Sequence, residues 1–335
     1  MPESEISTGD FARAARSVLP HSPVLLDQAF EDPTAVLEMV PRHAPYWPVM
    51  RYAAGAGELK AMVGDVRYSV EPWFRGDWAG DAPPVEGVDR ILWNPVFLDG
   101  ARRLFDAEIV VPRTVYVNLM APMADQATAH SDIPVFRGID KPAYPVWLLH
   151  VMHRSGLFAA WRVEIATAVS WFYEGEGGEF EFWPQGPSAA PRRIDAPLSN
   201  RGIVGDNERM FHRIAAIGTP GAPLLTGATV DSELRPVGEG SDAWRVVSEG
   251  CELIRYEASE LRISVSWKAE IFSDPEAART RREGTDDLDL EAVVDILMDA
   301  LAAAGESCRR PSNPLRDEEF IARLNALYPM PSLVE

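Results

Sequence analysis

The sequence predicts a mainly β fold with flanking helices, and a jelly roll fits its pattern best. From Ile109 to Phe272 the chain consists of short runs rich in β-branched and aromatic residues, bounded by Gly, Pro, Asn and Asp, which is typical of strands. No helical pattern separates these runs, so an antiparallel sandwich or barrel is favoured over a doubly wound α/β sheet. Both flanks of this region carry helical patterns instead.

We divide the chain into three parts of what we expect to be one compact domain. Residues 1–108 form an N-terminal irregular and helical region that braces the core. Residues 109–272 form the β core, with an insertion at about 218–260. Residues 273–335 supply C-terminal helices that pack on the core.

Prolines interrupt most of the N-terminal region and leave room for few helices. A short helix is expected at Thr34–Val40 and a longer one at Val96–Asp106, where apolar residues recur at near-helical spacing. The second helix leads directly into the first core strand, so we expect it to support the sheet.

Alternating apolar and polar residues mark the best strands of the core. Val115–Leu119, Glu179–Phe182 and Leu261–Trp267 all alternate, which predicts strands with one buried face. We expect about eight strands in total.

Two helices are expected after the core. The first carries an apolar face over Leu290–Leu301 and follows the acidic pair Asp286 and Asp287. The second is expected after Asn313, as its cap, with Pro314 in its first turn.

Composition excludes several classes of function. The chain has 32 Lys and Arg against 51 Asp and Glu, a net charge of −19, so its average field repels nucleic acid and anionic membranes. Its two cysteines are far apart, which predicts neither a disulfide framework nor a zinc site. The acidic start, residues 1–7, lacks the apolar run of a signal peptide, and no apolar run approaches the ~18 residues of a membrane span. We expect a cytoplasmic protein with a small-molecule partner; the sequence does not determine its oligomeric state.

Two histidines and one aspartate form the candidate metal site. His130 and Asp132 are two residues apart, so on an extended strand both side chains project from the same face and reach one ion. His212 follows a glycine-rich hairpin and begins another predicted strand. Two imidazoles and one carboxylate make a facial triad, which leaves open positions on iron(II).

The other histidines are assigned structural roles. His150 and His153 are the main rival ligand pair, but a spacing of three places them on opposite faces of a strand and suits a helix better. His21 and His43 are treated as hydrogen-bonded or surface residues.

A second polar pair, Arg262 and Ser264, lies two residues apart among apolar neighbours. A buried guanidinium needs an anionic partner, and its planar fork beside a hydroxyl suits a carboxylate held by two bonds. The alternative is an arginine exposed on an edge strand. A dicarboxylate co-substrate would supply the anion.

Over residues 109–272 these motifs resemble the iron(II)/2-oxoglutarate oxygenase superfamily: His130-x-Asp132, Gly177-Gly178-Glu179-Phe180, His212 and Arg262-x-Ser264. The resemblance implies a double-stranded β-helix, the cupin-like form of the jelly roll, with Fe(II) bound by the two histidines and the aspartate. It also implies that Arg262 pairs with the distal carboxylate of 2-oxoglutarate, that Ser264 hydrogen-bonds it, and that O2 is the other co-substrate. The activity implied is oxidation of a substrate, hydroxylation by default, with release of succinate and CO2.

The chain departs from many members of that superfamily because 50 residues separate the second histidine from Arg262. Residues 218–260 look like an insertion with an extra hairpin at about Trp244–Tyr256. Arg255 is therefore kept as a reserve anchor, and Arg213 is disfavoured because it points away from its neighbour His212 on a strand.

For the substrate we expect a small organic molecule. Tyr116 and Asn118 share one strand face, so both can face the pocket, with Asn118 beside 2-oxoglutarate. Arg137 and Trp183 are candidates for the pocket mouth. Two other classes stay open: a cupin-type metal-dependent dioxygenase or isomerase that does not use 2-oxoglutarate, and a non-catalytic jelly-roll binding module.

Overall fold

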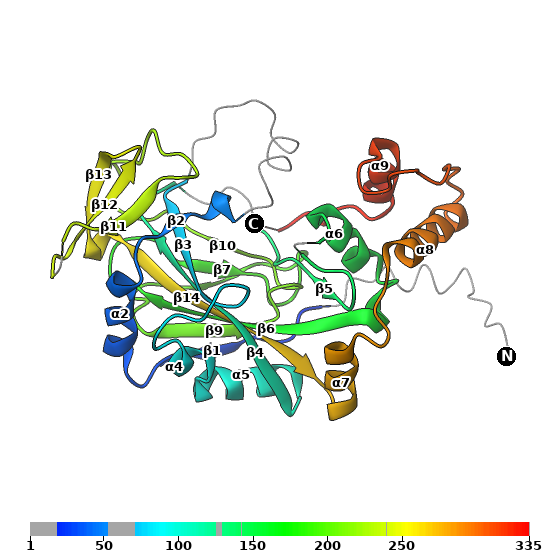
Figure 1. Cartoon of the computed structure of the whole chain (residues 1–335), viewed down its shortest axis with the longest axis horizontal. Coiled ribbons are helices and arrows are strands. Elements are labelled where there is room, and N and C mark those ends of the chain that lie inside the picture. The colour runs from blue at the N-terminus through cyan, green and yellow to red at the C-terminus, as the bar shows by residue number, and fades with distance from the viewer. Residues whose placement is uncertain (1–18, 53–70, 125–128, 142, 239, 335) are drawn as a thin grey trace.

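The structure, a computed structural model, describes residues 19–52, 71–124, 129–141, 143–238 and 240–334 (Figure 1). The acidic residues 1–7, on which the expectation of no signal peptide rests, lie outside this part of the chain. Within it, no helix is long and apolar enough to cross a membrane.

The fold is built on one large antiparallel sheet. Its strands lie in the order β1 (Val24–Leu26), β9 (Arg201–Gly205), β6 (Arg162–Phe172), β14 (Arg262–Phe272), β4 (Ile109–Met120), β3 (Trp73–Ala79) and β2 (Trp47–Pro48), and β5 (Val135–Phe136) pairs with the start of β6.

A smaller sheet completes the jelly roll. It has the order β10 (His212–Ile214), β7 (Phe180–Phe182) and β8 (Arg192–Ile194), and bridges from His130 and Met123 extend it. Trp171 and Ile203 of the large sheet pack with Phe180 and Phe182 of the small one in a single buried cluster. The predicted β-sandwich class is therefore confirmed, as a double-stranded β-helix.

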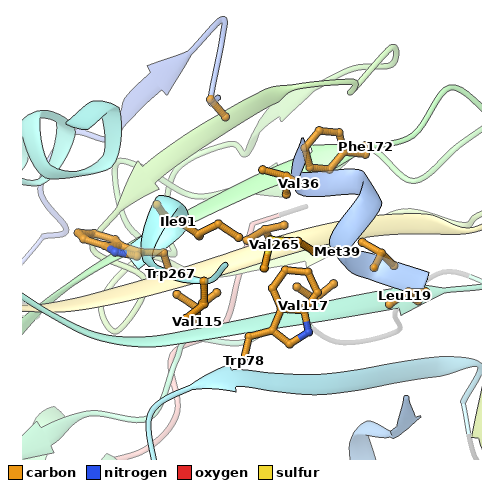
Figure 2. Packing of buried hydrophobic residues seen from close by; sticks show 14 of the residues in the cluster. Val36, Met39, Trp78, Ile91, Val115, Val117, Leu119, Phe172, Val265 and Trp267 are labelled. Carbon is orange, nitrogen blue, oxygen red and sulfur yellow. The ribbon is translucent and has the colours of Figure 1, made fainter. Parts of the chain in front are cut away.

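The two faces of the large sheet differ because side chains alternate along each strand. On β14, Val265 and Trp267 point into the main apolar core, and on the paired β4 so do Val115 and Val117. Figure 2 shows these side chains together with Val36 and Met39 of α2 (Pro33–Arg42). The intervening polar residues of both strands face the small sheet.

Helix α5 (Pro95–Phe105) covers the apolar face, together with α4 (Asp89–Leu92) (Figure 1). It begins where Asn94 accepts the N–H of Val96, with proline in the first turn, as helix starts favour. Phe97 of α5 lies 5.8 Å from the ring of Trp267. The helices expected at Val96–Asp106 and Thr34–Val40 are both present.

The N-terminal region was expected to be irregular and helical, but it also contributes β1, β2 and β3 to the large sheet. The first two are only three and two residues long, too short for alternation to mark them. β3 alternates in burial only from Trp73 to Trp78, and sequence reasoning missed it.

The insertion forms a separate three-stranded sheet of β11 (Glu233–Pro236), β12 (Ala243–Ser248) and β13 (Cys251–Glu257). The hairpin expected at Trp244–Tyr256 is present, since β12 pairs with β13. The described part of the chain also contains three single turns of 3-10 helix: η1 (Val49–Arg51), η2 (Ala159–Trp161) and η3 (Ala258–Glu260).

Helices α6 (Val146–Ser155), α8 (Leu290–Ala303) and α9 (Glu318–Leu327) share a second apolar cluster beside the β core. The last two were expected, but the cap of α9 is Asp317 and not Asn313, because Asp317 accepts the N–H of Phe320. Helix α7 (Pro275–Glu283) was missed; it has no fully buried residue, so no apolar stripe marks it.

The packing of α5 on the sheet predicts a large effect of Phe97→Ala. Phe97 is 0% exposed, and removing a buried phenylalanine side chain costs about 3–5 kcal/mol. Urea unfolding should show that loss in the free energy of unfolding, whereas Trp93→Ala, at a position 57% exposed, should change little. Equal effects of the two substitutions would contradict this packing.

Candidate metal centre

The structure brings His130, Asp132 and His212 together. Their ligand atoms all lie within 4.8 Å of one another, the one such group of His, Cys, Asp or Glu found among the described residues. The backbones of His130 and His212 exchange two hydrogen bonds, of 3.0 and 2.9 Å, and their rings lie 4.6 Å apart. Two segments far apart in sequence, strand β10 and the chain at His130, therefore present both imidazoles to one point.

Hydrogen bonds orient the side chains of His212 and Asp132. Nδ1 of His212 lies 3.0 Å from the carbonyl of Met210, which places the proton there and leaves Nε2 as a metal donor. Asp132 accepts from Lys268 at 2.8 Å and from Thr167 at 3.4 Å, both at Oδ2. Its Oδ1, 3.9 Å from Nε2 of His212, remains for the ion.

Charge keeps this carboxylate ionised. Burial alone raises the pKa of Asp132, but the ammonium of Lys268 and the two imidazoles outweigh it and hold that pKa below its usual range. For Lys268 the signs are opposite. Burial lowers its pKa, but the carboxylate of Asp132 raises it by more, so the pKa of Lys268 lies above its usual value. The triad thus offers one carboxylate and two imidazoles, the combination typical of non-haem iron(II).

A cavity of about 670 Å³ opens between the two sheets above this group. Neighbouring strands of the large sheet line it in register, because Ser264 pairs with both Trp171 and Asn118, and Asn118 pairs with Arg75. The polar face of the sheet is therefore the wall of the cavity.

Arg262 lies at the end of this wall and is 0% exposed. Its Nε donates to the carbonyl of Gly178 at 2.7 Å, while its Nη2 has no hydrogen-bond partner among the described residues. Burial lowers its pKa to about 9, and no described carboxylate forms an ion pair with it. A buried guanidinium in this state fits an anionic ligand.

Gly178 allows this arginine to approach. Its φ is +71°, which favours glycine, and a Cβ there would lie 2.8 Å from Cδ of Arg262. The glycine pair noted in the sequence thus serves both the turn and the arginine.

Asn118 and Ser264 lie beside each other on paired strands, with Nδ2 of the asparagine 3.5 Å from Oγ of the serine. Oδ1 of Asn118 is buried and has no partner in the described part of the chain. With Arg262 they form a buried set of polar groups in one cavity with the triad, which is what a dicarboxylate chelating the metal requires.

The other sequence-predicted residues fall in different places. Tyr116 lines the cavity, with the guanidinium of Arg75 3.9 Å from its ring centroid. Arg137 does not line it, because its guanidinium is bound to Asp286 at 2.7 Å through both Nε and Nη2. Trp183 also lies outside, since its indole donates to Val334 at 2.7 Å.

The reserve anchor and the rival ligands lie elsewhere as well. Arg255 is an exposed residue of the insertion sheet and pairs with Glu252. His150 and His153 belong to α6, as their spacing indicated, and line a separate cavity. Arg213, as expected, points away and pairs with Glu181.

Sequence reasoning missed several cavity residues: Lys268, Thr167, Arg75 and Asp77. A signal existed for Lys268, because it continues the two-residue spacing of Arg262 and Ser264 on β14. The other three alternate on β6 and β3 in the same way.

No family model matches the chain, and no curated protein matches its sequence. Solved structures match most of it at low identity. A 2OG-Fe(II) oxygenase family oxidoreductase from Burkholderia pseudomallei is 14% identical, with a TM-score of 0.39, over 82% of this chain and 94% of that one. A prolyl-4-hydroxylase from Pseudomonas putida is 12% identical, with a TM-score of 0.38, over 79% and 100%.

HygX from Streptomyces hygroscopicus, with nickel, 2-oxoglutarate and hygromycin B bound, is 8% identical, with a TM-score of 0.37, over 78% of this chain and 86% of that one. Because each of these TM-scores is below 0.5 and each identity below 25%, the assignment of the site rests on the chain's own residues.

The geometry predicts that His130→Ala or His212→Ala abolishes binding of a divalent ion, because either change leaves two protein donors. His150→Ala should bind the ion as the wild type does. Metal content after loading with iron(II) without oxygen measures this, and a loss that follows His150 would overturn the assignment.

Proposed function

We propose that the chain is a non-haem iron(II), 2-oxoglutarate-dependent oxygenase. The observation that carries the proposal is the joint presence, in one cavity, of the His130, Asp132 and His212 group and the buried, unpaired Arg262. A metal enzyme that does not use 2-oxoglutarate has no need of a buried guanidinium at the cavity end, and a binding module has no need of the triad.

Iron(II) with 2-oxoglutarate and O2 would supply the oxidising chemistry, with release of succinate and CO2. The chain's own residues then bind and orient. Arg262 and Ser264 hold the far carboxylate, with Asn118 beside them, and Lys268 keeps Oδ1 of Asp132 directed at the ion. These are positioning roles, which account for a large part of such catalysis.

The substrate we propose is a small organic molecule that undergoes hydroxylation. It would lie against the part of the cavity wall formed by β3 and β4, where Tyr116 and Trp73 provide ring surfaces and Arg75 and Asp77 provide charges of both signs. A substrate bound against this wall would displace water from beside the reacting group.

The proposal predicts slow consumption of 2-oxoglutarate even without the true substrate. Succinate should appear only when both iron(II) and O2 are supplied, and His212→Ala should remove the activity. Succinate measured by chromatography, in matched samples with a chelator or under nitrogen, tests this. Succinate that forms equally with the chelator would contradict the proposal.

The buried arginine predicts a specific loss of co-substrate binding. Removing one partner of a buried charged pair costs roughly 2–5 kcal/mol, so Arg262→Ala should raise the 2-oxoglutarate Kd by about 30-fold or more. Arg262→Lys keeps the charge but loses the two-pronged geometry and should also bind more weakly.

Titration of the anaerobic iron(II) protein with 2-oxoglutarate, followed by the visible band of the chelate, gives the Kd. Arg255→Ala is the matched control, since that guanidinium is exposed in the insertion sheet. If iron binds but 2-oxoglutarate produces no chelate band, a metal enzyme that does not use 2-oxoglutarate is the better description. A loss in Arg255→Ala with little change in Arg262→Ala would move the anchor to Arg255.

A further inference from the structure

The main cavity, of about 670 Å³ beside the metal triad, has a neighbour of about 330 Å³ beside α6, which we call the second cavity. The charged groups of the second cavity are already bound to one another. Arg162 is ion-paired with Glu208 at 2.6 Å and Arg209 with Glu164 at 2.6 Å, and the two arginine side chains are only 5% and 8% exposed. Open charges for a ligand lie in the main cavity instead, on strand β3.

Strand β3 presents an arginine and an aspartate to the main cavity. Arg75 and Asp77 both line it, because side chains alternate along the strand and Gly76 between them faces the core. A Cβ on Gly76 would lie 2.7 Å from the ring of Tyr46, so that ring already fills the core side. The side chains of Arg75 and Asp77 are 24% and 29% exposed, and a ligand in the cavity can therefore reach them.

One hydrogen bond joins the two residues, from Nε of Arg75 to Oδ1 of Asp77 at 2.7 Å. Among the described residues, Nη1 and Nη2 of Arg75 and Oδ2 of Asp77 have no hydrogen-bond partner. A guanidinium has five N–H donors and an ionised carboxylate has two acceptor oxygens, so each group keeps unused capacity. The pair can therefore bind an anionic group and a cationic group at the same time.

Two tyrosine rings hold the guanidinium in place. Cζ of Arg75 lies 3.9 Å from the ring centroid of Tyr116 and 5.1 Å from that of Tyr52. The hydroxyl of Tyr52 donates to the carbonyl of Arg75 at 3.0 Å, which fixes that ring against β3. A guanidinium held against ring faces presents its N–H edge in one direction, which suits a planar carboxylate bound through two bonds.

The charged pair and the metal ligands lie on different strands of the cavity wall. Arg75 belongs to β3, whereas Lys268 and Thr167, which bind Asp132, belong to β14 and β6. Strand β4 separates β3 from β14, so their backbones are roughly 10 Å apart at the usual strand spacing. A molecule held by its charged end at β3 must therefore extend along the wall to reach the ion.

The lining that such a molecule meets near the ion is apolar. Ile133, Pro134 and Val135 follow the ligand Asp132 directly and line the same cavity. Val49 adds a further apolar side chain to the lining. The cavity therefore suits a molecule with a doubly charged end and an apolar body.

We propose that the substrate is an α-amino acid with an apolar side chain, whose carboxylate binds Arg75 and whose ammonium group binds Asp77. This assignment rests on the proposed oxygenase function, because it names the molecule that the metal centre oxidises. The two ends of the amino acid match both charges of the pair, so neither charged residue loses its partner on binding. The apolar side chain extends toward the ion, and the oxidised carbon belongs to that side chain.

The test measures binding of L-leucine, L-phenylalanine and L-tryptophan by calorimetry. It uses protein loaded with iron(II) and 2-oxoglutarate without oxygen, and also metal-free protein, in which an amino acid cannot bind by chelating iron. At least one of the three should bind to both forms. Its analogues without the carboxylate or without the amine, such as phenethylamine and 3-phenylpropionate, should bind at least about tenfold more weakly, since each loses a charge-assisted contact.

Arg75→Gln and Asp77→Asn separate the two contacts. Arg75→Gln should weaken binding of the amino acid by about tenfold or more and remove its advantage over the amine. Asp77→Asn should weaken it similarly and remove its advantage over the acid. Arg235→Gln is the matched control, because Arg235 pairs with Glu233 two residues away on β11 and lines neither cavity.

Both cavity variants should keep the 2-oxoglutarate chelate band, which shows that they are folded. The comparison of ligands on the wild type applies even if a variant is unstable. Three outcomes would overturn the inference: none of the three amino acids binds, an analogue with one charge binds as tightly, or neither cavity variant weakens binding. All three are compatible with a normal chelate band, so the oxygenase proposal can stand when the amino-acid site fails. Loss of that band in the wild type, with amino-acid binding intact on metal-free protein, would overturn the oxygenase proposal instead.

Discussion

Strand β14 is hydrogen-bonded on both sides, to β4 and to β6, and the rest of the molecule depends on that register. Its odd-numbered residues, such as Val265 and Trp267, enter the apolar core, while Arg262, Ser264 and Lys268 face the cavity. A slip of one residue would exchange the two faces, burying the charges against α5 and exposing the core. The same pairing therefore stabilises the fold and assembles the site.

The candidate metal centre depends on a second pairing, between the backbones of His130 and His212. It joins segments 82 positions apart, by the difference of their residue numbers, and sets both imidazoles on one side of the small sheet. The turn before β10, residues 206–209, lies between this centre and the second cavity. Asn207 accepts the N–H of Asp132 at 2.8 Å, and the next residue, Glu208, lines the cavity behind.

Buried polar atoms without hydrogen-bond partners in the described part of the chain lie at both cavities, and others lie in the core and the insertion sheet, on Trp78, Arg235, Arg245 and Tyr256. In the main cavity they belong to Arg262 and Asn118; in the second, to Glu208, Arg162 and Arg209. Each such atom costs about 1–3 kcal/mol if left unsatisfied, so a ligand that supplies the missing bonds in the main cavity stabilises the fold.

Local pattern in the sequence was enough to predict the jelly-roll class, the α5 helix and the closeness of His130 and Asp132, because alternation and helical spacing are properties of adjacent residues. The strand expected at these two residues is a single bridge at His130. Local pattern also contained the row on β14 that ends at Lys268. Tertiary structure alone placed Arg262 in the cavity and Arg255 on the exposed insertion sheet, excluded Arg137 and Trp183 from the cavity wall, and formed the second cavity. Those outcomes depend on which distant segments pair and which faces meet, and the spacing of residues along the chain does not encode that directly.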